Sequence, residues 1–287
     1  MTFYKYQGAG NDFLIADNRD GHIRESNGVL TAVEADGSIW RKSIACLCDR
    51  RYGIGADGLM LLEDAAGYDF RMCYFNSDGS GGMMCGNGGR CIVAFAADIG
   101  IASYDFVASD GSHTARIIRH DGRERLVRLK MKDVSEIVRY AGLKDVSVPS
   151  DGVFIDTGTR HFVRFVNGLD AYDVEAEGRE IRYDAEEFMP VGVNVNFVEP
   201  VGGKLKIRTY EKGVEGETFA CGTGIVAGCV ASYVSGVPSD IVGGRISYDV
   251  QAKRDSLSVD FLPGTGKTVA QDVWLTGPAV YVARLEL

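Results

Sequence analysis

Short apolar runs, broken by glycine or aspartate, recur along most of the 287-residue chain. They are rich in Val, Ile, Phe and Tyr, and runs of this length and composition predict β-strands. The pattern therefore predicts a fold dominated by sheet. The predicted strands are residues 13–16, 59–62, 70–74, 126–131, 162–166, 195–198, 205–209, 257–261 and 280–285.

Two longer segments have a different pattern, because they are apolar nearly all round. Each follows a Cys-Gly-x-Gly tetrapeptide, the first at residues 85–88 and the second at residues 221–224. A helix that is apolar on every side is buried, and glycine is a typical helix stop. The pattern predicts two buried helices, at residues 89–99 and 225–234, which end at Gly100 and Gly236.

The second tetrapeptide follows the first by close to half of the chain. An internal repeat explains this spacing, with two halves that each wrap short strands around one central helix. We place the join near Lys130 and expect the terminal segment to return to the first half. The predicted domains are residues 1–130 with 277–287, which carry Cys85, and residues 131–276, which carry Cys221.

A glycine-rich turn at the start of a helix offers backbone N–H groups and the positive end of the helix dipole, which together bind anions. A cysteine at such an end is favoured as thiolate. Two of these turns facing each other would hold one carboxylate, with Cys85 and Cys221 on either side to remove and return a proton. The alternative is that both cysteines are small buried hydrophobic residues.

Six runs in this sequence resemble diaminopimelate epimerase, in that family's order and over nearly the whole chain. The resemblance implies a cofactor-independent amino-acid epimerase with an α+β fold. It also implies two pseudo-symmetric domains, each a curved mixed sheet or barrel around a central helix, with the site in the cleft between them. The runs are residues 6–13, 49–58, 75–80, 84–91, 192–197 and 217–224.

The resemblance also implies roles for individual residues. Cys85 and Cys221 match the family's two catalytic bases, and His161 matches a supporting histidine. The implied substrate-binding residues are Asn11, Asn76, Gly86, Asn87, Thr159, Asn194, Glu211, Lys212, Gly222 and Thr223.

Two departures from the family pattern concern the far end of the substrate. Thr159-Arg160 stands where Asn or Ser followed by Pro is usual, and Lys212 stands where Arg is usual. Lysine is a point charge, whereas arginine binds a carboxylate with two parallel donors. Two alternatives therefore stay open beside diaminopimelate epimerase, the enzyme of lysine and peptidoglycan precursor synthesis. One is a related racemase of histidine or lanthionine, and the other is a non-catalytic, redox-sensing dithiol protein.

Net charge and composition indicate which kinds of molecule this protein binds. The formal net charge is −9, which argues against nucleic acid binding. The sequence shows no signal peptide and no apolar stretch long enough to cross a membrane, which predicts a cytoplasmic protein with a small amino-acid substrate. Four scattered histidines predict no metal site, and no lysine lies beside a phosphate-binding loop, so we expect no cofactor. The oligomeric state stays open, with a homodimer among the alternatives.

Overall fold

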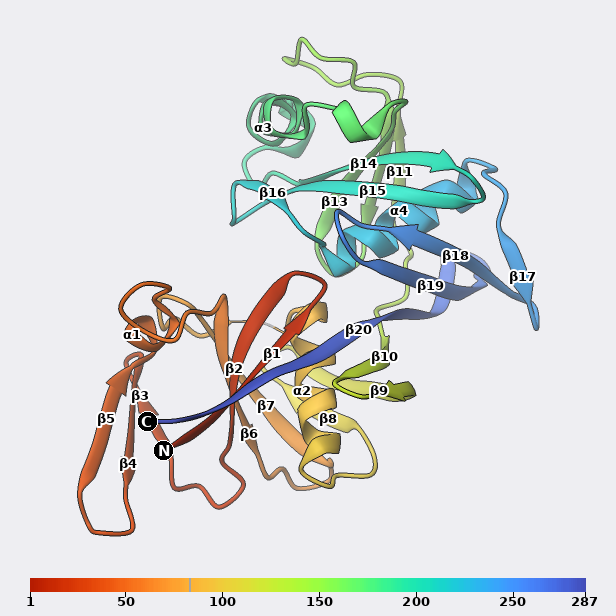
Figure 1. Ribbon diagram of the computed structural model, residues 1–287. Helices are drawn as coiled ribbons and strands as arrows, with labels where there is room; N and C mark the ends of the chain where they lie inside the picture. Colours follow the sequence, from red (N-terminus) through yellow and green to blue (C-terminus); the bar gives the residue numbers. More distant parts are fainter. Residues whose placement is uncertain (83) are drawn as a thin grey trace. The chain divides into compact units, whose positions relative to one another are not determined.

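The computed structural model describes residues 1–82 and 84–287. The chain divides into two compact units. The first contains Met1–Leu129 and Gly277–Leu287, and the second contains Lys130–Thr276. The long last strand, β20 (Ala270–Glu286), contributes residues to both units (Figure 1).

The first unit is a closed ring of eight strands around the helix α2 (Gly86–Asp98). Around the ring, β1 pairs with β2, and then β6, β7, β8, β9, β10 and β20 follow, with β20 returning to β1. The helix packs against β1, β2, β6 and β9 (Figure 1). The strands are β1 (Thr2–Gly8), β2 (Asn11–Asp17), β6 (Gly58–Glu63), β7 (Phe70–Asn76), β8 (Asp105–Ala108), β9 (Gly111–Asp121) and β10 (Glu124–Lys130).

The second unit repeats this arrangement around the helix α4 (Gly222–Val234). From β12 to β20 its pairings are antiparallel, parallel, antiparallel, parallel, antiparallel and antiparallel. The series from β1 to β9 has the same first five pairings in the same order. The sixth, between β9 and β10, is antiparallel as well. The strands are β11 (Ile137–Tyr140), β12 (Gly152–Asp156), β13 (Arg160–Phe165), β14 (Asn194–Val201), β15 (Lys204–Glu211), β16 (Gly216–Thr218), β17 (Asp240–Val242), β18 (Arg245–Gln251) and β19 (Ser256–Pro263).

The eighth position also corresponds in the two rings. The end of β20 pairs with β1 in the first unit, and β11 pairs with β12 in the second. The bridge between Val134 and Ala270 joins the segment before β11 to the start of β20. The predicted internal repeat and the predicted fold class are therefore confirmed.

Both predicted helices are present, and each begins three residues earlier than the pattern indicated, directly after its cysteine. Gly100 and Gly236 follow their last turns with φ of 90° and 75°. This left-handed conformation is the one in which glycine ends a helix. The glycine stops are therefore confirmed at both sites.

One helix of the second unit was not expected from the pattern. It is α3 (Val174–Asp184), and its buried residues are Val174, Gly178 and Ile181. Gly178 packs so closely against the Tyr210 side chain that there is no room for a side chain of its own. A Cβ at residue 178 would come within 2.4 Å of the Tyr210 Cβ. The apolar period is interrupted by this glycine, which is why the sequence pattern did not show the helix.

The remaining elements lie outside the two rings of strands. In the first unit, β3 (Arg24–Ser26), β4 (Val29–Val33) and β5 (Ile39–Ser43) form a separate three-stranded sheet, which α1 (Ile44–Cys48) follows. The second unit has two short 3₁₀ helices, η1 (Leu169–Ala171) and η2 (Glu186–Phe188). Among the described residues, no helix is long and apolar enough to cross a membrane, and no group of three His, Cys, Asp or Glu is arranged to hold a metal ion.

Candidate active site

Cys85 is the residue immediately before α2, in an extended conformation with φ of −96° and ψ of 135°. The first helical bond runs from the Gly89 N–H to the Cys85 carbonyl at 2.7 Å. The N–H groups of Gly86, Asn87 and Gly88 therefore precede the helical ladder and point out of its positive end. Cys85, which is partly exposed, therefore lies at a helix end suited to an anion.

A tyrosine of β7 lies close to this cysteine. Burial is the main cause that raises the pKa of Tyr74, and the negative charge of a Cys85 thiolate raises it further. Tyr74 also packs against Gly82, where a Cβ would come within 2.4 Å of the ring. Tyr74 thus remains a neutral phenol beside Cys85.

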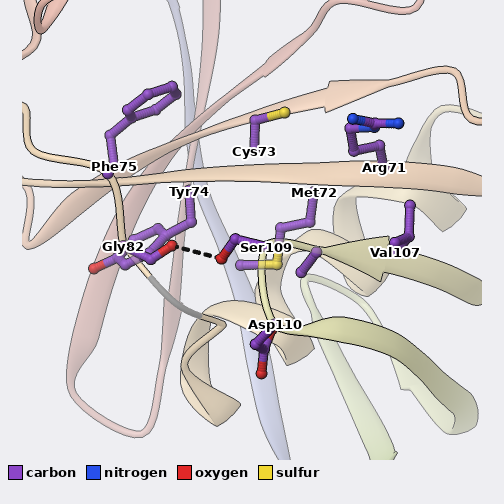
Figure 2. A pocket seen from close by; sticks show the side chains of 11 residues that line it. Arg71, Met72, Cys73, Tyr74, Phe75, Gly82, Val107, Ser109 and Asp110 are labelled. Carbon is purple, nitrogen blue, oxygen red and sulfur yellow. Dashed lines mark hydrogen bonds between the residues drawn. The ribbon is translucent and has the colours of Figure 1, made fainter.

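A cavity of about 580 Å³ lies on this side of the first unit, lined by β7, Gly81, Gly82 and residues 107–110 (Figure 2). The Ser109 hydroxyl donates to the Gly82 carbonyl at 3.0 Å, and the Gly82 N–H donates to the Tyr74 carbonyl at 3.0 Å. These two bonds fix Gly82, three residues before Cys85, on the edge of β7.

The structure brings two of the predicted substrate-binding amides of the first unit into direct contact. Asn87 Nδ2 donates to Asn11 Oδ1 at 2.6 Å. Asn76 lies at the end of β7 and donates to the Ser80 hydroxyl at 3.0 Å. A Cβ on Gly82 would lie 3.2 Å from Asn76 Oδ1, so Asn76 lies beside the segment that leads to Cys85.

Cys221 has the equivalent position in the second unit, immediately before α4, with φ of −99° and ψ of 110°. The first helical bond runs from the Ile225 N–H to the Cys221 carbonyl at 2.8 Å. The N–H groups of Gly222 and Thr223 precede it. The Cys221 Sγ lies 3.5 Å from the Thr223 hydroxyl, and the cysteine is buried.

A carboxyl group lies beside the Cys221 thiol. Glu211 accepts a hydrogen bond from the Thr218 hydroxyl at 2.8 Å and interacts with the Cys221 side chain. Burial raises the pKa of Glu211, and its two side-chain hydrogen bonds only partly offset that effect. The pair therefore consists of a buried thiol and a carboxyl group that accepts protons more readily than an exposed glutamate.

His161 is buried and is held from both sides. Asn196 Nδ2 contacts its Nδ1 at 3.1 Å, and the Thr159 hydroxyl contacts its Nε2 at 2.9 Å. Asn196 accepts from Thr209 through Oδ1, so its Nδ2 group must donate to His161. His161 therefore accepts at Nδ1 and carries its proton on Nε2, facing Thr159.

Burial lowers the pKa of His161 to about 3, although the hydrogen bond from Asn196 acts in the opposite direction. His161 is thus neutral at physiological pH. Between pH 6.5 and pH 3 the unfolded chain binds a proton at this residue that the folded chain does not, so the stability falls as the pH is lowered.

We expect His161→Gln to remove this pH dependence. From pH 6.5 to pH 5, the parental chain should lose about 2 kcal/mol more unfolding free energy than the variant. Urea unfolding at several pH values measures the difference, with His120→Gln at an exposed position as the control. If the free energy of unfolding falls equally with pH in the parental chain and in His161→Gln, His161 is not buried in its neutral form.

Asn194 connects Arg160 with Lys212 through two hydrogen bonds. Asn194 donates to the Arg160 carbonyl at 2.9 Å and accepts from the Lys212 backbone N–H at 2.9 Å. The Lys212 residue is exposed. The Arg160 guanidinium donates to the Phe188 carbonyl at 3.1 Å and lies over the Phe154 ring. Arg160, one of the departures from the family pattern, is thus engaged in packing.

Sequence reasoning missed several residues that the structure places around these groups. Asn196 orients His161, although only Asn194 of the same run was singled out. The two asparagines are two residues apart on β14 and therefore share a face of that strand. This spacing was the available signal. The other missed residues are Asp57, Tyr74, Arg90, Thr209 and Thr218.

Comparison with solved structures shows which fold this chain shares with other proteins. A phenazine biosynthesis protein of the PhzF family from Bacillus anthracis superposes with a TM-score of 0.70 and 15% identity, covering 100% of this chain and 98% of that one. A hydroxyproline epimerase from Agrobacterium vitis has a TM-score of 0.63 and 13% identity, covering 99% and 91%. At these identities the likeness shows a shared fold.

Sequence comparison then gives the family. The diaminopimelate epimerase model matches residues 3–136 and 153–265. A diaminopimelate epimerase from Flavobacterium psychrophilum is 40% identical over 98% of both chains, and one from Aquifex aeolicus is 40% identical over 83% of both. The chain belongs to the diaminopimelate epimerase family, and it is an isomerase.

Proposed function

We propose that this chain interconverts LL- and meso-diaminopimelate by moving the proton on Cα, with Cys85 and Cys221 as the two acid–base groups. One observation carries the proposal. The central helix of each repeated unit begins directly after a cysteine, and the first turn that follows is Gly-x-Gly in both. Each unit therefore supplies one cysteine at the start of its central helix.

The reaction needs one base and one acid. One cysteine, as thiolate, removes the Cα hydrogen as a proton, and the C–H electron pair stays on the substrate as a carbanion. The other cysteine, as thiol, delivers its proton to the opposite face of Cα and becomes the thiolate. The roles reverse in the opposite direction, so the apparent pKa values belong to the pair.

The carbanion places negative charge on the substrate carboxylate. The N–H groups of Gly86, Asn87, Gly222 and Thr223 precede the helical ladders, and such groups stabilise this charge together with the helix dipoles. These fixed dipoles, with the ammonium group of the substrate, take the part that a pyridoxal Schiff base plays in other racemases. The proposal therefore includes no cofactor.

Groups in the second unit support Cys221. Glu211, with its raised pKa, can accept a proton from the thiol beside it. The neutral His161 adds no charge and holds the Thr159 hydroxyl at 2.9 Å. We further propose that the enzyme works in the cytoplasm in lysine and peptidoglycan precursor synthesis, where a reducing environment keeps its cysteines as thiols.

The test is hydrogen exchange at Cα. Purified chain and LL-diaminopimelate in D₂O should give meso-diaminopimelate with deuterium at the inverted carbon. Histidine and lanthionine are run in parallel, and the proposal requires diaminopimelate to have the highest kcat/KM. Exchange with another amino acid alone would overturn the substrate assignment. Loss of exchange with every amino acid in a folded chain would overturn the enzyme mechanism.

A further inference from the structure

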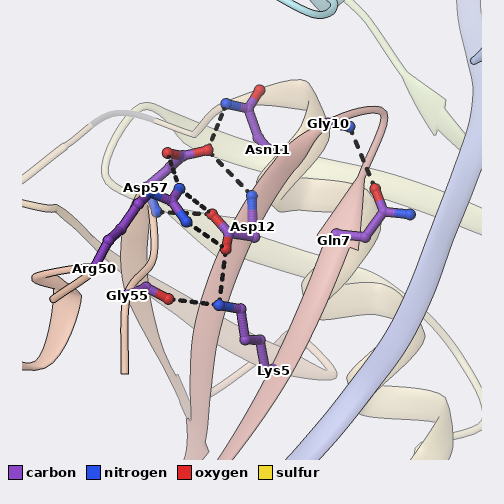
Figure 3. A network of polar contacts seen from close by, with 8 residues as sticks. All are labelled: Lys5, Gln7, Gly10, Asn11, Asp12, Arg50, Gly55 and Asp57. Atoms are coloured by element: carbon purple, nitrogen blue, oxygen red, sulfur yellow. Dashed lines mark hydrogen bonds and ion pairs between the residues drawn. The ribbon is translucent and has the colours of Figure 1, made fainter. Parts of the chain in front are cut away.

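A directed chain of side-chain hydrogen bonds runs through the first unit. Arg90 Nη2 donates to Asn87 Oδ1 at 2.8 Å. Asn87 Nδ2 donates to Asn11 Oδ1 at 2.6 Å, and Asn11 Nδ2 donates to Asp57 Oδ2 at 2.9 Å. Figure 3 shows the outer end of the chain, where Asn11 meets Asp57. Two amides thus lie between a guanidinium group and a carboxylate.

The two ends decide which way both amides face. A guanidinium group only donates hydrogen bonds, and a carboxylate only accepts them. Asn87 must therefore turn its oxygen toward Arg90, and Asn11 must turn its NH₂ group toward Asp57. If Asn11 were rotated by half a turn, its oxygen would face the Asp57 carboxylate and its NH₂ group would face that of Asn87.

Both ends of the chain are held in place. Arg90 is completely buried and also donates to the carbonyls of Gly86 and Pro278, each at 3.3 Å. Asp57 accepts from Arg50 Nη2 at 2.7 Å on its other oxygen. It also accepts from the backbone N–H of Asp12 at 3.2 Å (Figure 3).

Asp12 belongs to the same ion cluster, and its carboxylate accepts from the Asp57 backbone N–H at 3.2 Å. Its carboxylate accepts from Arg50 at 2.6 and 3.0 Å, and it lies 2.9 Å from Lys5 Nζ. These contacts lower the pKa of Asp12 despite its burial. Asp12 therefore stays ionised and holds Arg50, while Asn11 is oriented by Asn87 at its oxygen and by Asp57 at its NH₂ group.

We propose that Asp57 is a positioning residue, which orients Asn11 so that this amide presents an N–H donor and not a carbonyl oxygen to a carboxylate of the substrate. An Asn NH₂ group has two hydrogens, and Asp57 takes one of them. The second hydrogen is the one offered to an anion. This inference rests on the proposed function, because it takes the ligand at Asn11 to be the amino-acid substrate.

The variant that tests the inference is Asp57→Asn. The new side chain has the same shape, and its oxygen can keep the bond from Arg50 while its NH₂ group turns toward Asn11 and gives up the bond from the Asp12 N–H. Asn11 then loses the acceptor that fixes its NH₂ group, and only the bond from Asn87 still holds it, so more of the molecules can present the Asn11 oxygen, which repels a carboxylate. We expect the KM for diaminopimelate to rise by about tenfold or more, while kcat changes by less than about threefold.

Asp12→Asn is the matched control, since it makes the same chemical change in the same ion cluster. We expect it to alter KM by less than about twofold. An Asp57→Asn variant with unchanged KM, or with a loss confined to kcat, overturns the positioning role. An equal rise in KM in both variants also overturns it, because the effect would then come from the ion cluster as a whole.

The melting temperature of Asp57→Asn and its direct binding of diaminopimelate are measured as well. If Asp57→Asn melts more than about 10 °C below the parent, it is replaced by Arg50→Gln, which leaves the carboxylate but removes the cation that holds it. KM must then rise at least about threefold. A parental chain that exchanges no Cα hydrogen overturns the proposed function instead. Calorimetric binding of diaminopimelate to the parent and to Asp57→Asn then decides the positioning role, which requires weaker binding by the variant.

Discussion

Replacing either Cys85 or Cys221 with serine is expected to lower kcat for epimerisation by about 10³-fold or more. General acid–base catalysis contributes about 10²–10⁴-fold per group, and a serine hydroxyl is a far weaker acid than a thiol. Each variant keeps one cysteine that can still remove the Cα proton. We therefore expect each to exchange the Cα hydrogen of one stereoisomer only, with the two variants acting on opposite stereoisomers.

Proton magnetic resonance of LL- and meso-diaminopimelate in D₂O measures both results. Cys46→Ser is the control, because Cys46 is exposed and lies in α1, not at the start of a central helix. It should retain the parental rate. Full epimerisation by both Cys85→Ser and Cys221→Ser would show that the two-base assignment is wrong.

Gly224→Ala is expected to reduce both stability and activity. A Cβ at residue 224 would lie 2.3 Å from Asn196 Oδ1, well inside van der Waals contact. Asn196 is buried and accepts from Thr209, so it cannot retreat without losing the bonds that orient His161. We expect the free energy of unfolding to fall by about 2–3 kcal/mol, and kcat/KM to fall by about 10²-fold.

The matched control is Gly142→Ala, where an added Cβ meets no heavy atom within 4 Å. Thermal unfolding should show a decrease of about 5–10 °C for Gly224→Ala and little change for Gly142→Ala. If Gly224→Ala has the same melting temperature and the same activity as the parental chain, the close approach of α4 to Asn196 does not matter for the site.

Local chemistry explains what could be predicted from the sequence. A helix end depends on a few neighbouring residues, so Gly100 and Gly236 marked the ends of α2 and α4 correctly. The repeated tetrapeptide indicated two equivalent units, and the pairing order of the strands agrees. Asn11 and Asn87 were both named as site residues, although nothing in the spacing showed that they touch.

The tertiary structure decided the contacts between distant residues. Asn196 follows His161 by 35 positions, and Asn87 follows Asn11 by 76, so no periodicity connects either pair. Parallel pairing of β2 with β6 brings Asp57, just before β6, next to the start of β2. Hydrogen bonds that set a tautomer or the direction of an amide depend on such pairings.

The sequence by itself thus determined the two helices that each follow a cysteine, the predominance of sheet and the repeat, because each follows from the chemistry of adjacent residues. Only the tertiary structure decided that Asp57 faces Asn11 and that His161 is neutral between Asn196 and Thr159. The physical reason is that orientation and protonation depend on partners and burial, which the chain acquires only when its strands pair.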